Sequence, residues 1–80
     1  MPIEGKLQQR ILLEIARISK ELESDRPPEG SRKILTSLIT LLTYVVRGEL
    51  SIEEFVVLTM KCPYMPVGLY YQEFFKDELV

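Results

Sequence analysis

The sequence predicts an all-α protein, a small antiparallel helical bundle of three to four helices in which residues 1–80 form a single domain. Three features indicate this fold: apolar residues recur at helical spacing over residues 7–22, residues 34–46 carry no charge, and a helix-start motif begins at residue 51. An 80-residue domain buries only about 60–65% of the surface that its unfolded chain exposes. We therefore expect every apolar face to need a partner, within the chain or outside it.

The first expected helix begins at residue 4 or 6 and ends at residue 23. Its inward apolar residues are spaced by four, four, three and four positions: Leu7, Ile11, Ile15, Ile18 and Leu22. Opposite charges four residues apart, Arg10 with Glu14 and Arg17 with Glu21, are expected on the outer side, where such pairs stabilise a helix by a few tenths of a kcal/mol.

Residues 24–31 interrupt the helical pattern, because two prolines there remove amide donors. Ser31 is then expected to cap a second helix over residues 32–47, and Gly48 to end it. This helix contains the uncharged run of residues 34–46, which would rise about 20 Å and is too short to cross a bilayer. Its apolar residues occupy more than one face and leave a thin polar seam of three residues, Thr36, Thr40 and Thr43.

A buried strand is the rival interpretation of this run, since Ile, Val and Thr are common in it. A sixteen-residue strand would extend about 50 Å, which is out of scale for a domain of this size. Length therefore favours the helix, and a helix that is apolar on several sides needs neighbours on several sides.

The third expected helix begins after Ser51, with Glu54 completing a capping box and with Leu50 and Phe55 in the two positions of a hydrophobic staple. It should end near Lys61, because Pro63 disfavours helix at the residue before it. A short fourth helix is expected from residue 67 or 68 to residue 79. Its inward residues are expected to be Leu69, Tyr70, Phe74 and Leu79, with Tyr71 and Phe75 beside them.

Composition argues against catalysis, against a metal or other cofactor, and against a small-molecule substrate. The chain has no histidine and one cysteine, Cys62, so the usual base for a thiol nucleophile and the usual zinc ligands are missing. Glu53 and Glu54 are adjacent in a helix and would point about 100° apart, which does not suit an acid/base pair. One unpaired cysteine and the absence of a signal-peptide pattern predict an intracellular protein, cytoplasmic or nuclear, with no membrane segment.

The function that the sequence favours is non-catalytic protein–protein interaction. We expect a small adaptor, regulator or inhibitor that presents an apolar helical surface to another protein or, as a homodimer, to its own copy. Six apolar or aromatic residues are the candidate contacts, because each lies at the edge of a stripe that is full without it or belongs to an aromatic cluster too wide for one neighbour to cover: Leu12, Leu13, Tyr64, Tyr70, Tyr71 and Phe75.

The alternative is a nucleic-acid-associated transcriptional regulator that uses a basic patch at the first loop. Residues 1–48 contain eight Lys or Arg against six acidic residues, whereas residues 49–80 contain two against six. A phosphate backbone would be repelled by the second part, so the candidate contacts are Arg26, Arg32 and Lys33. The expected third helix starts with two glutamates, which disfavours it as a DNA-recognition helix.

Overall fold

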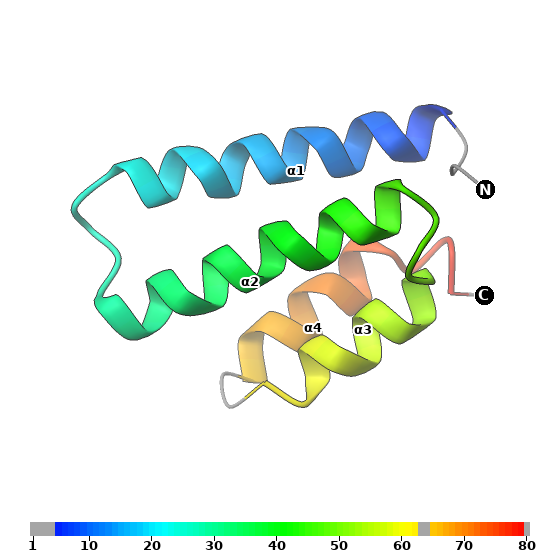
Figure 1. Ribbon diagram of the computed structural model, residues 1–80. Helices are drawn as coiled ribbons and strands as arrows, with labels where there is room; N and C mark the ends of the chain where they lie inside the picture. Colours follow the sequence, from blue (N-terminus) through cyan, green and yellow to red (C-terminus); the bar gives the residue numbers. More distant parts are fainter. Residues whose placement is uncertain (1–4, 63–64, 80) are drawn as a thin grey trace. The chain divides into compact units, whose positions relative to one another are not determined.

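A computed structural model describes residues 5–62 and 65–79 of the chain. Over these residues the protein is all-α, with helices α1 (Gly5–Glu23), α2 (Glu29–Val46), α3 (Ile52–Met60) and α4 (Met65–Phe74) and with no strand. α1 packs against α2, and α3 packs against α4 (Figure 1). The predicted fold class, a small all-α helical bundle, is confirmed.

The chain divides into two compact units, residues 1–49 and residues 50–80. We call them the N-terminal hairpin, which contains α1 and α2, and the C-terminal hairpin, which contains α3 and α4. That residues 1–80 form a single domain stays a prediction. Within the described residues, none of the helices has the length and apolar character needed to span a membrane.

α1 begins at Gly5, between the two predicted starts, and ends at Glu23 as predicted; its buried face is formed by Ile11, Glu14 and Ile18. The buried glutamate departs from the prediction, which placed the charged residues on the outer side: Glu14 is only 5% exposed. Spacings of three and four residues put it on the same face as the two isoleucines. Its carboxylate accepts two hydrogen bonds from Arg17, with Nε at 2.9 Å and Nη2 at 2.8 Å, and this paired geometry offsets the cost of burying a charge.

α2 begins at Glu29, three residues before the predicted start, so the prediction that Ser31 caps it is wrong. The N-cap residue is Pro28, with an extended backbone (φ −65°, ψ 162°) and no side-chain cap. Its carbonyl accepts the first helical hydrogen bond, from the Arg32 amide at 3.0 Å. A proline has no amide to satisfy at this position, and Glu29 in the first turn is favoured by the helix dipole.

The polar seam of α2 satisfies its hydroxyl groups within the helix. Each of its three threonines, and Ser37 in the same helix, donates a hydrogen bond to the carbonyl four residues earlier, at 2.7–3.2 Å. On the opposite side Leu38, Leu42 and Val45 are buried. The seam therefore faces outward at little cost in free energy, and the apolar stripe on the opposite side of α2 packs into the core.

Gly48 ends α2 as predicted. Its φ of 77° lies in the left-handed region that favours glycine. The Gly48 amide bonds the Val45 carbonyl at 3.0 Å and the Glu49 amide bonds the Tyr44 carbonyl at 2.9 Å, the pair of bonds that defines a Schellman motif.

The start of α3 is also confirmed. The Ser51 hydroxyl accepts a hydrogen bond from the Glu54 amide at 3.1 Å and donates one to the Glu54 carboxylate, also at 3.1 Å. The helix ends at Met60, within one residue of the predicted end, and Phe55, Val56 and Thr59 are buried.

α4 begins earlier and ends earlier than predicted, and its inward face is a different one. Tyr71 is 1% exposed and Phe75 is 0% exposed, whereas Leu69 and Tyr70, which were expected to point inward, are exposed. The ring of Phe55 lies edge-on to Tyr71 and to Phe75, with centroid distances of 5.0 and 5.7 Å. The expectation that Tyr71 and Phe75 lie on the surface is therefore wrong, because these rings form the core of the C-terminal hairpin.

A close approach between the two helices selects this inward face. Gly68 is buried against Met60, and a Cβ atom added to Gly68 would lie 2.8 Å from the Cα and Cγ atoms of Met60. Tyr71 and Phe75 follow Gly68 by three and seven residues, which places them on the same side of α4. The glycine thus brings the helix backbones together where the rings must reach α3.

Candidate functional site

The outer side of α1 presents two adjacent leucines to solvent. Leu12 is 47% exposed and Leu13 is 72% exposed, and together with Gln9 they line a shallow hollow. We call these three residues the α1 outer surface. The predicted exposure of both leucines is confirmed, and their role in binding stays a prediction.

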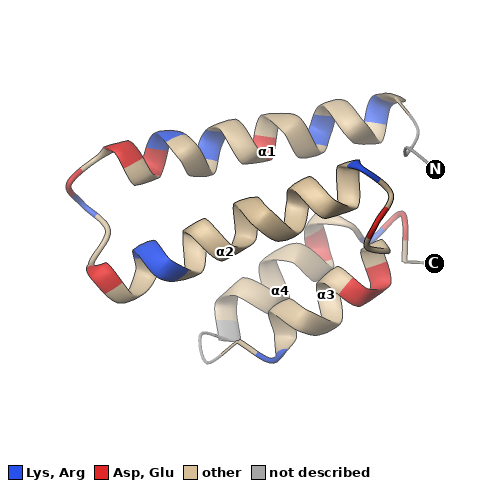
Figure 2. Ribbon diagram, viewed as in Figure 1, with Lys and Arg blue, Asp and Glu red and all other residues tan. Residues whose placement is uncertain are grey.

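Positive charge surrounds the α1 outer surface. Between residues 5 and 20 every exposed charged side chain is basic, and the acidic one, Glu14, is buried beneath Arg17. Figure 2 shows basic segments in blue along the ribbon of α1, with an acidic segment between them. The exposed basic residues of this stretch are Lys6, Arg10, Arg17 and Lys20. On a helix, Arg10 and Arg17 lie three and four residues from Leu13, so an apolar centre has cationic neighbours on both sides.

A second exposed patch lies on α3 and was not predicted from the sequence. Glu53, Glu54, Val57 and Leu58 line a shallow hollow, and we call these four residues the α3 outer surface. All four side chains are exposed. The signal was present in the spacing: a nine-residue helix that buries residues 55, 56 and 59 must turn residues 53, 57 and 58 away from them.

The aromatic candidates divide between core and surface. Tyr70 is exposed, and its ring lies edge-on to that of Tyr71 at 4.8 Å, so it covers one side of the buried cluster. Tyr71 and Phe75 belong to that cluster and are not available to a partner. The remaining candidate, Tyr64, lies outside the described residues.

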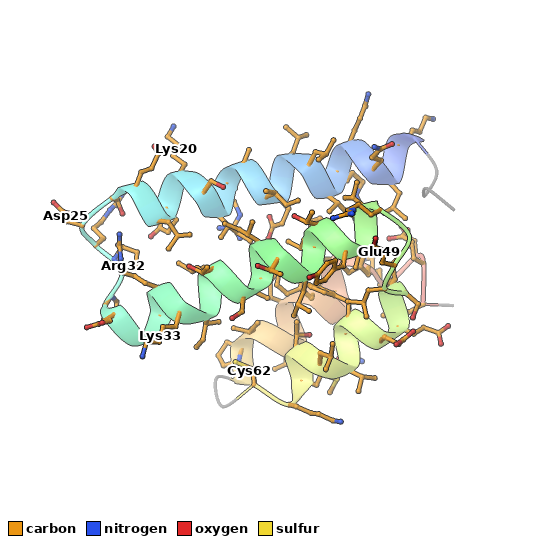
Figure 3. The ribbon with its side chains drawn as sticks, viewed as in Figure 1. Lys20, Asp25, Arg32, Lys33, Glu49 and Cys62 are labelled. Carbon is orange, nitrogen blue, oxygen red and sulfur yellow. The ribbon has the colours of Figure 1, made fainter. Side chains whose placement is uncertain are left out.

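The three basic residues proposed for nucleic acid differ in their surroundings: Arg32 is half-buried, and Arg26 and Lys33 are exposed. Arg32 donates hydrogen bonds to the carbonyls of Leu22 at 2.6 Å and Ser24 at 2.9 Å, so its guanidinium group caps the end of α1. Lys33 points away from that loop (Figure 3), and Arg26 is exposed. Two donors of the Arg32 guanidinium group are therefore occupied within the protein, and the nucleic-acid alternative stays a prediction.

Arg32 and Lys33 do line a common hollow, but an acidic residue lines it too. Its walls come from the loop end of both N-terminal helices: Leu22, Glu29, Arg32, Lys33, Thr36 and Ser37. The carboxylate of Glu29 would oppose a phosphate group there.

Groups that could support chemistry are sparse in the part of the chain that the structure describes. No three His, Cys, Asp or Glu side chains there gather closely enough to hold a metal ion. Cys62 follows α3 and is half-buried. Lys76 forms an exposed ion pair with Glu73 at 3.0 Å, and the hydrogen bond that the lysine donates to this carboxylate raises the pKa of Lys76 above its ordinary value. A raised lysine pKa leaves the amine charged at neutral pH, so it is not prepared to act as a base.

Comparisons of the chain with protein-family models, with curated protein sequences and with solved structures gave no match.

Proposed function

We propose that the protein is a non-catalytic protein-binding module, a small adaptor, regulator or inhibitor, whose α1 outer surface is covered by a second copy or by another protein. The observation that carries this proposal is the exposure of two neighbouring leucines, Leu12 and Leu13, on the side of α1 opposite its buried face. Contiguous apolar surface of this kind is typical of interaction sites.

Burying the two leucines does not by itself supply enough free energy for association. Fully burying a leucine side chain contributes roughly 1.5–3 kcal/mol, whereas association costs about 4–15 kcal/mol in lost translational and rotational freedom. A partner must therefore cover more of α1 than the two leucines, and acidic groups on that partner would face the basic residues of the helix. Charge complementarity of this type mainly sets specificity and the rate of association.

The test is to place a charge at the centre of the surface. Leu13→Asp adds a carboxylate at the most exposed leucine, and Gln72→Asp adds one at an exposed position on α4, a helix that does not contribute to this surface. Circular dichroism should show that both variants remain helical. Each is compared with the wild type by light scattering after size exclusion and by affinity capture from cell extract.

We expect Leu13→Asp to lose self-association or the captured partner and Gln72→Asp to retain it. The proposal is overturned if the wild type has the monomer mass at every concentration and captures the same proteins as Leu13→Asp.

A further inference from the structure

We propose that the α3 outer surface of one copy docks onto the α1 outer surface of a second copy. This inference rests on the proposed function, because it takes the α1 outer surface to be a binding site and adds the identity of the occupant. Both surfaces have an apolar pair at the centre: Leu12 with Leu13 on α1, and Val57 with Leu58 on α3.

The charges on the two surfaces are complementary. The exposed charged residues of α1 up to residue 20 are all basic, and one of them, Arg17, is already paired with the buried Glu14 carboxylate. The α3 outer surface carries two exposed carboxylates, Glu53 and Glu54, one helical turn before its apolar pair. Leucine contacts would thus be flanked by pairs of opposite charge, which are attractive and favour this pairing over others.

The same charges oppose a symmetric dimer. Where a two-fold contact pairs a surface with itself, α1 on α1 would oppose basic residues to basic residues, and α3 on α3 would oppose glutamates to glutamates. Over the whole units only the second is strongly charged: residues 50–80 contain two basic and five acidic residues, whereas residues 1–49 contain eight and seven. We therefore place α1 of one copy against α3 of the next, a heterologous contact that joins the N-terminal hairpin of one copy to the C-terminal hairpin of another.

A heterologous contact leaves one surface of each kind unoccupied at the ends of the assembly. Copies can then add in succession, so the mass should rise gradually with concentration instead of stopping at a dimer. The two surfaces are small, and small interfaces belong to weak and transient complexes. At a given protein concentration, added salt should lower the mass, because it screens the exposed flanking charges.

The experiment mixes two variants that are each blocked on one surface. Leu13→Asp blocks the α1 outer surface and keeps the α3 outer surface, while Val57→Asp does the reverse. We expect each variant alone to be monomeric. Their equimolar mixture should form a one-to-one pair of twice the monomer mass, and the pair should not grow further because both of its remaining surfaces are blocked.

A second variant distinguishes loss of the contact from loss of the fold. Glu53→Lys keeps the apolar pair and reverses one exposed charge, and it should weaken self-association while circular dichroism stays unchanged. Gln72→Asp is the matched control and should assemble like the wild type.

The other outcomes overturn the proposal and separate it from the proposed function. If Leu13→Asp blocks association and Val57→Asp does not, the α1 outer surface binds something other than α3, so this inference falls and the proposed function stands. If both variants alone are monomeric and their mixture also stays monomeric, the wild-type contact is symmetric. If the wild type is monomeric throughout the concentration range, a second copy is not the occupant, and the capture experiment alone decides the proposed function.

Discussion

The two hairpins reach a packed core by different means. The N-terminal hairpin has helices of 19 and 18 residues, whose buried apolar side chains are aliphatic. The C-terminal hairpin has helices of 9 and 10 residues, and its core is a group of aromatic rings around Phe55. Long helices distribute burial over many turns, whereas short ones depend on a few large side chains and on a close approach at Gly68.

The first way to test this contrast is to remove the central ring with Phe55→Ala. Truncating a fully buried phenylalanine costs about 3–5 kcal/mol, and here it also removes both edge-on ring contacts. We expect amide hydrogen exchange to show protection lost in α3 and α4 and retained in α1 and α2. An equal loss of protection in all four helices would show that the hairpins do not have separate cores.

The second test concerns the close approach of α3 and α4. Gly68→Ala would place a Cβ atom 2.8 Å from the Met60 Cα, a backbone atom that can move away only if the helices separate. We expect a loss of about 1–3 kcal/mol in urea unfolding, the usual cost of overpacking.

The matched control for this change is Gly5→Ala in α1. No neighbouring atom lies within 4 Å of the added Cβ there, so this variant should be neutral or more stable by up to about 1 kcal/mol. Equal unfolding midpoints for the two variants would refute the close approach as a determinant of the C-terminal hairpin.

The third test addresses the loop of the N-terminal hairpin. Arg32→Met keeps an apolar stem and removes the guanidinium group that bonds the Leu22 and Ser24 carbonyls. We expect a loss of about 1–2 kcal/mol, because the site is half-buried and the bonds are charge-assisted. Lys33→Met, at the exposed neighbouring position, should change the unfolding free energy by less than about 0.5 kcal/mol. If the two variants lose the same stability, the arginine contributes only its charge.

The smallest expected effect compares the helix starts of the two hairpins. Ser51→Ala removes the hydroxyl that accepts the Glu54 amide and should cost about 1 kcal/mol. Ser31→Ala should cost less than about 0.5 kcal/mol, because α2 starts at Glu29 and Pro28 is its N-cap residue. Thermal unfolding of both variants is sufficient, and a larger loss for Ser31→Ala would contradict the observed start of α2.

Features that depend on neighbouring residues could be predicted from the sequence. The cap at Ser51 and the left-handed residue at Gly48 each need only a few adjacent residues, and both are found as predicted. The start of α2 was missed because Pro28 and Ser31 are both acceptable cap residues, and the choice between them depends on how the loop packs against the end of α1. Arg32 fixes this packing, because the carbonyls that accept its hydrogen bonds lie eight and ten residues earlier.

The candidate site was predictable only in part, for the same reason. The exposure of Leu12 and Leu13 follows from the spacing within α1 alone. The roles of the paired aromatics do not, because the choice of Tyr71 and Phe75 over Tyr70 and Leu69 depends on the contact between Gly68 and Met60. The α3 outer surface was missed although the spacing of the buried residues 55, 56 and 59 turns residues 53, 57 and 58 away from the core.

The most direct test of the account is the mass of the wild type and of Leu13→Asp by light scattering after size exclusion, over a hundredfold range of concentration. The account predicts that the wild-type mass rises above 9.3 kDa with concentration and that the variant stays at the monomer mass. Indistinguishable masses for the two proteins at every concentration would contradict the claim that the α1 outer surface is where a second copy binds.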